Sequence, residues 1–111
     1  KKIKNDNQDF IINKVKDVIE HPMISKYFER NQHVLSEQDV LVPNGVTLRP
    51  DRVNLLKDGG AVIIDYKTGD PKEADGFQID KYAQIYISLN YFPVEKFLVY
   101  IGDKINVYHR K

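Results

Sequence analysis

A short apolar run, Ala61-Val62-Ile63-Ile64, constrains the fold of this chain more than any other sequence feature. Turn signals bound it on both sides, because Asp58-Gly59-Gly60 precedes it and Thr68-Gly69-Asp70-Pro71 follows shortly after it. A run of this length and composition is typical of a strand that is buried on both faces of a sheet. We therefore expect residues 61–65 to form a central strand with a covering layer on each side.

The hydrophobic period changes along the chain and predicts the other elements. Ile11, Val15, Val18 and Ile19 have the spacing of one helix face, and the same period returns after residue 75. We expect helices at 9–20 and 75–89, a short helical turn at 24–30, and strands at 33–42, 46–56, 61–65, 97–101 and 105–109. This order predicts an α/β fold with a mixed central sheet flanked by helices.

Length and composition indicate one domain over residues 1–111. The chain is 41% hydrophobic and 30% charged, which is typical of a globular protein, and it does not begin with Met, so we expect a fragment of a longer protein. No run approaches the roughly 18 apolar residues of a membrane span, and we expect no membrane partner. The net charge of +1 gives no indication of nucleic-acid binding by itself.

The chain contains no cysteine, which excludes several classes of site. A disulfide scaffold, a thiolate zinc site, a cysteine-held iron–sulfur cluster and a cysteine nucleophile all require that residue. A cysteine-free composition is consistent with a reducing compartment, so we expect a cytoplasmic location.

Two aspartates and a lysine lie around the predicted hairpin. Asp65 and Lys67 are two residues apart on one strand, so their side chains share a face. A turn centred on residues 58–60 would place Asp51 across from residues 66–68, beside both side chains. Two carboxylates at the end of a buried strand suit Mg²⁺ or Mn²⁺, and a neighbouring lysine suits phosphodiester hydrolysis. A simple ion pair of Asp65 with Lys67 or Arg52 is the alternative.

Three segments together resemble the PD-(D/E)XK nucleases. They are Arg49-Pro50-Asp51-Arg52, then Ile63-Ile64-Asp65-Tyr66-Lys67-Thr68-Gly69, and then Gln78-Ile79-Asp80-Lys81-Tyr82 on the second predicted helix. The third segment is similar to the Gln-x-x-x-Tyr element of the RecB-type branch, found at the C-terminal ends of bacterial helicase–nucleases. The resemblance runs from Glu37 to Ile101 and implies the restriction-endonuclease-like αβββαβ core of these enzymes.

The resemblance implies a metal centre and its chemistry. Asp51 and Asp65 would bind Mg²⁺ or Mn²⁺ with help from the backbone carbonyl of Tyr66. Lys67 would orient or activate the attacking water.

The resemblance implies supporting roles for three further residues. Gln78 and Tyr82 would contact DNA or brace the site, although Tyr82 equally fits the core face of its helix. Glu37 has the place of an acid found in related proteins, and it also suits a solvated strand start.

Activity and partners follow from the same resemblance. It implies a metal-dependent deoxyribonuclease that acts on DNA, with a helicase region in the same polypeptide or complex, in recombinational repair. RecB-type nucleases usually carry a metal-binding histidine on a helix before the first strand. Here His21 follows the first predicted helix and His33 starts the first predicted strand. A non-catalytic DNA-binding domain with the nuclease fold and a protein-interaction domain therefore remain as alternatives.

Overall fold

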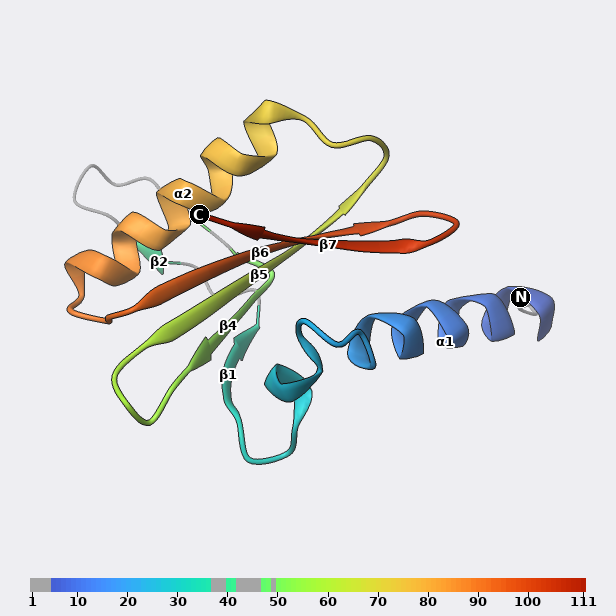
Figure 1. Ribbon diagram of the computed structural model, residues 1–111, viewed down its shortest axis with the longest axis horizontal. Coiled ribbons are helices and arrows are strands. Elements are labelled where there is room, and N and C mark those ends of the chain that lie inside the picture. Colours follow the sequence, from blue (N-terminus) through green and yellow to red (C-terminus); the bar gives the residue numbers. More distant parts are fainter. Residues whose placement is uncertain (1–4, 37–39, 42–46, 49) are drawn as a thin grey trace.

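The structure is a computed structural model that describes residues 5–36, 40–41, 47–48 and 50–111 (Figure 1). The helices are α1 (Asn5–Ile19), the short 3-10 helix η1 (Ser25–Phe28) and α2 (Glu73–Ser88). The strands are β1 (His33–Ser36), β2 (Val40–Leu41), β3 (Thr47–Leu48), β4 (Arg52–Leu55), β5 (Ala61–Thr68), β6 (Val94–Ile101) and β7 (Ile105–Arg110). Both predicted helices and the helical turn between them are thereby confirmed.

Five strands form a mixed sheet in the order β1-β4-β5-β6-β7. β5 and β6 are parallel and are connected through α2, whereas the other neighbouring strands are antiparallel. The apolar run Ala61-Val62-Ile63-Ile64 lies in the central strand β5, and all four residues are fully buried. The predicted central strand is confirmed, and it continues beyond the predicted end to Thr68.

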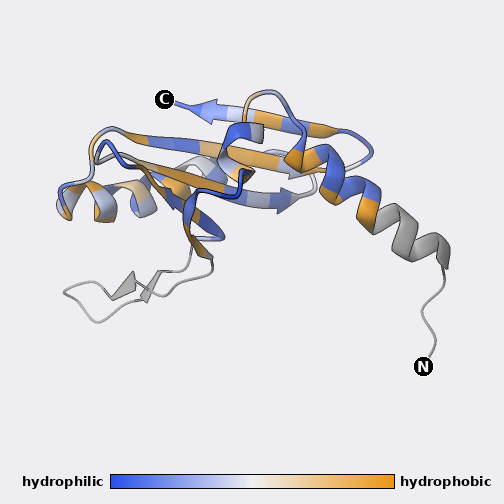
Figure 2. Ribbon diagram, turned by 90° about the horizontal axis from the view of Figure 1, so that it is seen from below, coloured by the Kyte–Doolittle hydropathy of each residue, from blue (hydrophilic) through white to orange (hydrophobic). Residues whose placement is uncertain are grey.

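The sheet separates two hydrophobic layers (Figure 1). On one face, Ile79 and Tyr86 of α2 pack against Ile63. On the other face, Val18 of α1 belongs to a cluster with Ile64 and with residues of η1. Alternate residues of β5 therefore face different layers, as the pleat of a strand requires. Figure 2 shows the hydrophobic residues along the central strands between these layers.

Two of the predicted strands are each divided in the structure. Residues 33–42 contain β1 and β2, and residues 46–56 contain β3 and β4. β2 and β3 pair only with each other and form a separate two-stranded sheet. Buried Pro50 lies just before β4, and a proline cannot donate a hydrogen bond to a strand ladder. The first and second predicted strands were therefore too long, although each contributes one strand to the main sheet.

The apolar stripe of α1 is only partly buried. Val18 contacts the core, whereas 51% of Val15 and 40% of Ile19 remain exposed, and the helix extends away from the sheet (Figure 1). The Lys14 Nζ donates to the backbone carbonyls of Gly102 and Asp103, which attaches the helix to the β6–β7 turn. Neither α1 nor any other helix in the described part of the chain has the length and apolar character needed to cross a membrane.

Candidate active site

β5 carries a buried acid and a lysine on the face that α2 covers. Asp65 directly follows the apolar run and is only 3% exposed. The Lys67 Nζ lies 3.1 Å from Oδ2 of Asp65. The predicted sharing of one strand face by these two side chains is thus confirmed, and their ion pair is present.

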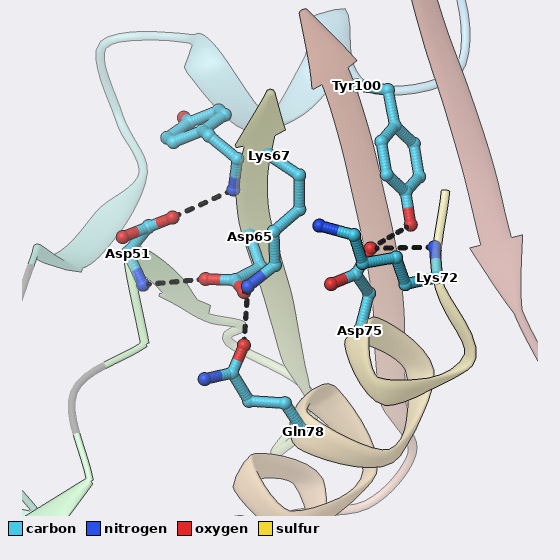
Figure 3. A network of polar contacts seen from close by, with 8 residues as sticks. Asp51, Asp65, Lys67, Lys72, Asp75, Gln78 and Tyr100 are labelled. Atoms are coloured by element: carbon cyan, nitrogen blue, oxygen red, sulfur yellow. Dashed lines mark hydrogen bonds and ion pairs between the residues drawn. The ribbon is translucent and has the colours of Figure 1, made fainter. Parts of the chain in front are cut away.

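Asp51 completes a pair of acids at this point. It immediately precedes β4 and lies across from Asp65, because the next pair along the hairpin is Arg52 with Ile64. The Tyr66 N–H donates to Oδ2 of Asp51 at 2.8 Å, and the Asp51 N–H donates to Oδ1 of Asp65 at 3.4 Å (Figure 3). The two carboxyl groups are therefore held together by the backbone of both strands.

The register of this hairpin differs from the predicted one. Asp51 was expected across from residues 66–68, but the register places it across from Asp65. The reason lies in the turn, where the Leu56 N–H donates to the carbonyl of Gly60. This bond centres the turn on Asp58, so the partner of every β4 residue moves toward the start of β5. The observed register places the two carboxylates closer together than the predicted register did.

α2 brings Gln78 and Tyr82 to the same site. The Lys67 Nζ donates to Oε1 of Gln78 at 2.5 Å, so this ammonium contacts both β5 and α2 (Figure 3). Tyr82 is buried in the core layer between α2 and the sheet. Burial, and then the negative charges of Asp65 and Asp51, raise the pKa of Tyr82. Tyr82 thus has the core position that its spacing predicted.

The acidic pair has an unusual electrostatic state. Burial is the largest cause that raises the pKa of Asp65 from its ordinary 3.8 to about 6, and the contact with Asp51 is the next. The hydrogen bond and the positive charge of Lys67 act in the opposite direction and only partly offset these effects. The site therefore holds more negative charge than its one lysine neutralises.

A comparison with known families decides what kind of domain this is. The family model of the PD-(D/E)XK nuclease superfamily matches residues 2–106. The chain belongs to the PD-(D/E)XK nuclease superfamily. The predicted resemblance to this superfamily is therefore confirmed, whereas the match does not distinguish the RecB-type branch.

A solved structure has a similar fold. The crystal structure of SSO0001 is similar with a TM-score of 0.50 at 20% sequence identity, over 95% of this chain and 55% of SSO0001. This nuclease-superfamily chain thus spans about half the length of SSO0001. The superfamily match and this likeness together confirm the predicted restriction-endonuclease-like α/β fold, with its mixed five-stranded sheet. No curated protein matches the chain.

The residues at the acidic pair of this nuclease-superfamily domain fit a divalent cation. Carboxylate oxygens are the ligands that Mg²⁺ and Mn²⁺ prefer, and two such groups meet here directly after the buried apolar run of β5. Burial and then the contact with Asp51 raise the pKa of Asp65, so the second carboxylate adds a repulsion that Lys67 only partly offsets. A cation between Asp51 and Asp65 would relieve that repulsion.

The histidines considered as metal ligands, His21 and His33, lie away from the acidic pair. The Nδ1 of His21 accepts the Met23 N–H, and His21 lines a depression with Asp103 of the β6–β7 turn. His33 pairs with Leu55, at the end of the β1–β4 ladder remote from Asp51. Across the described ranges, no group of three or more histidine, cysteine or acidic side chains could hold a metal ion. Glu37 lies outside the described residues.

A second polar contact beside Lys67 was not anticipated from the sequence. The Tyr100 hydroxyl donates to Oδ2 of Asp75 at 2.8 Å, and the backbone N–H of Lys72 donates to the same oxygen at 3.1 Å (Figure 3). Tyr100 pairs with Lys67 across the parallel strands β5 and β6. This contact fixes the first turn of α2, and with it Gln78, relative to the sheet.

Proposed function

We propose that this domain is a metal-dependent DNA nuclease module that hydrolyses phosphodiester bonds. The observation that carries this proposal is the meeting of Asp51, Asp65 and Lys67 at one end of the β4–β5 hairpin. Membership in a superfamily of nucleases supports the reaction class. The fold alone would not, because one fold hosts many functions.

Each residue of the cluster has a distinct proposed role. Asp51, Asp65 and the backbone carbonyl of Tyr66 would hold Mg²⁺ or Mn²⁺. The bound cation would supply positive charge that stabilises the phosphate in the transition state. Lys67 orients the attacking water and donates to phosphate oxygens, since its ammonium lies at the opening between β5 and α2. Gln78 fixes the direction of that ammonium, and buried Tyr82 supports Asp65 from below.

A RecB-type role in a larger enzyme is the finer part of this proposal. The Gln78-to-Tyr82 element lies on α2 beside the acidic pair, as that branch would require. The domain would act on DNA together with a helicase region, in recombinational repair in the cytoplasm. The chain spans about half the length of SSO0001, so we propose that this domain acts as one part of a longer polypeptide.

A specific observation favours a second candidate function. In the parts of the chain with a described structure, the two carboxylates have no third histidine or acidic partner suited to a metal. A domain with a weakened metal centre would bind DNA without cutting it. The second candidate is therefore a non-catalytic DNA-binding domain that retains the nuclease fold.

Cleavage of end-labelled single- and double-stranded DNA separates these candidates. The reactions contain Mg²⁺, Mn²⁺ or a chelator, and they compare the parent chain with Lys67→Ala. Lys104→Ala, which changes an exposed lysine of the β6–β7 turn, is the matched control. A nuclease cuts with metal, stops with chelator, and loses activity by about a hundredfold or more in Lys67→Ala but not in Lys104→Ala.

Two other results would favour different conclusions. DNA binding without cutting under every metal condition would support the non-catalytic candidate. Equal cutting by the parent and Lys67→Ala would show that the cluster is not the site of hydrolysis.

A further inference from the structure

An aromatic side chain is exposed on α2 next to the proposed active site. Phe77 immediately precedes Gln78, and 58% of its surface is exposed. Its ring is 5.9 Å from the guanidinium of Arg110. Single exposed hydrophobic side chains are common, so a role for Phe77 depends on what lies next to it and not on its exposure alone.

Phe77 and Lys67 line the same depression. This depression has a volume of about 560 Å³ and is bounded by Lys67, Ala74, Asp75, Phe77, Gln78 and Lys81. That volume lies within the roughly 300–1,000 Å³ typical of small-ligand sites. A ligand that occupies the depression would therefore contact Phe77 and the ammonium of the catalytic cluster at once.

One lysine beside Phe77 is placed to contact a phosphate. Lys81 follows Phe77 by one helical turn, lies on the same helix face, and makes no ion pair with any described residue. Lys67 is already paired with Asp65, and the carboxylate of Asp75 also lines the depression, where its Oδ2 accepts hydrogen bonds from the Tyr100 hydroxyl and the Lys72 N–H. Among the residues that line the depression, Lys81 is therefore the cation that we assign to a phosphate.

We propose that Phe77 and Lys81 form a platform for one unpaired nucleotide of a single DNA strand, with the base on Phe77 and a phosphate beside Lys81. The proposal rests on the proposed nuclease function and names the part of the substrate that the site selects. Only an unpaired base presents its face to an aromatic side chain, which is why the platform favours single-stranded over double-stranded DNA. It carries no base preference, because every base can stack.

The direct test measures affinity for a fluorescent oligothymidylate and for an abasic oligomer with the same backbone. The proteins carry Asp65→Asn to prevent cutting, and they add Phe77→Leu, Phe77→Trp or Phe92→Leu. Phe92 is the matched control, because it is 79% exposed and lies after α2, away from the depression. We expect Phe77→Leu to weaken oligothymidylate binding about tenfold, and Phe77→Trp and Phe92→Leu to leave it within about twofold.

The abasic oligomer distinguishes stacking from a general effect on the fold. Its affinity should be the same for Phe77→Leu and the unmodified background, whereas Lys81→Gln should weaken both oligomers and reduce the dependence of binding on salt. An equal loss of both oligomers in Phe77→Leu, or no loss of either, would overturn the platform.

The failure of the platform is separable from the failure of the proposed function. If the parent chain cuts DNA with metal but Phe77→Leu binds oligothymidylate as tightly as the Asp65→Asn background does, the nuclease stands and the platform is wrong. If the parent neither binds nor cuts any DNA, both proposals are wrong.

Discussion

Asp65 is the residue at which stability and proposed function conflict most directly. Its carboxylate directly follows the apolar run of β5, and it lies beside a second carboxylate, from Asp51. A protein selected for stability alone would place an uncharged side chain there, because burial of an incompletely paired charge costs free energy. The conflict is typical of groups that act on a ligand rather than on the fold.

The first prediction concerns the stability of Asp65→Asn. In the native state the pKa of Asp65 is raised from its ordinary 3.8 to about 6, so the native state holds this proton more tightly than the unfolded chain does. The stabilisation that results is fully present below about pH 4 and is lost as the pH rises through 6. Above pH 6 the ionised acid lowers the free energy of unfolding by on the order of 2–3 kcal/mol. This figure already includes the favourable ion pair with Lys67. We expect Asp65→Asn to be more stable than the parent by about 1–2 kcal/mol near pH 7.5, and by much less near pH 4.

Urea denaturation at both pH values, with a chelator present, measures this difference. A gain of the same size at both pH values, or a variant less stable than the parent at neutral pH, would contradict the electrostatic account of Asp65.

Asn54 gives a second prediction at the scale of a residue. It is fully buried in β4, and its Nδ2 donates to the carbonyl of Tyr27 at 2.7 Å and to Oε1 of Gln32 at 2.9 Å. These bonds attach the segment around η1 to the sheet. Since Asn54→Ala removes them in a buried place, we expect it to lower the free energy of unfolding by about 2 kcal/mol. Asn106→Ala, on the exposed side of β7, is the control, and chemical denaturation measures both variants. An equally small effect of the two changes on the free energy of unfolding would show that the Asn54 bonds do not hold the η1 segment on the sheet.

The sequence predicts which residues form the candidate site better than it predicts how those residues are arranged. Asp65 and Lys67 could be placed on one face because the period of a strand is two. The partner of Asp51 could not be placed, because it depends on which backbone groups close the turn at residues 56–60. The contact between Tyr100 and Asp75 could not be found either, since it depends on the register of parallel strands joined through a helix.

At the scale of elements, α2 is attached to the C-terminal strand by a cluster of ionic contacts. Asp80 accepts hydrogen bonds from the guanidinium of Arg110, with Nη2 to Oδ2 at 2.8 Å, and from Lys96 of β6 at 2.9 Å. Arg110 is the largest cause that lowers the pKa of Asp80 to about 2. The contribution of this cluster to stability is therefore present above about pH 4 and is lost as the pH falls toward 2. It helps to hold the helix that carries Gln78.

Gly76 provides a test of this attachment. A Cβ added there would lie 2.5 Å from Nη1 of Arg110, so Gly76→Ala must displace the guanidinium that pairs with Asp80. The same change stabilises a helix interior by about 1 kcal/mol through backbone entropy. We expect Gly76→Ala to give that full gain in the Arg110→Ala background and clearly less in the parent. Chemical denaturation of the four proteins measures the coupling, and equal gains in both backgrounds would show that Arg110 does not pack on Gly76 in solution.

The elements with a strong hydrophobic period were the most predictable. β5 and α2 could be predicted because their apolar residues are buried by tertiary contacts. The division of the earlier strands could not be predicted, because the length of a strand depends on which neighbours it finds and not on its composition. α1 illustrates the same limit, since its stripe predicts burial but only Val18 among its described side chains is buried.

At the scale of the whole molecule, the chain is more elongated than its length requires. Its radius of gyration is 15.1 Å, whereas a compact domain of this size has about 13 Å. The excess comes with α1, which projects from the sheet and leaves 61% of Ile12 exposed (Figure 1). Most of the stabilising burial therefore lies in the sheet and α2.

This shape predicts an uneven distribution of local stability. Amides of α1 should exchange with solvent deuterium faster than those of β5 and β6 by at least about a hundredfold, because the helix can open without disturbing the core. Hydrogen exchange followed by mass spectrometry measures this difference, with α2 as the internal comparison. Protection of α1 equal to that of α2 would mean that α1 folds as one unit with the sheet.

The central claim is that the whole fold brings Asp51 and Asp65 together to hold a divalent cation. Calorimetric titration with Mn²⁺ tests it most directly, because the readout does not depend on whether the chain cuts DNA. The parent and Asp103→Asn, a change in the exposed β6–β7 turn, should both bind Mn²⁺ with release of a proton from Asp65 near pH 6, and Asp65→Asn and Asp51→Asn should both lose that binding. Mn²⁺ binding that is unchanged in Asp65→Asn, or no binding by the parent, would contradict the claim.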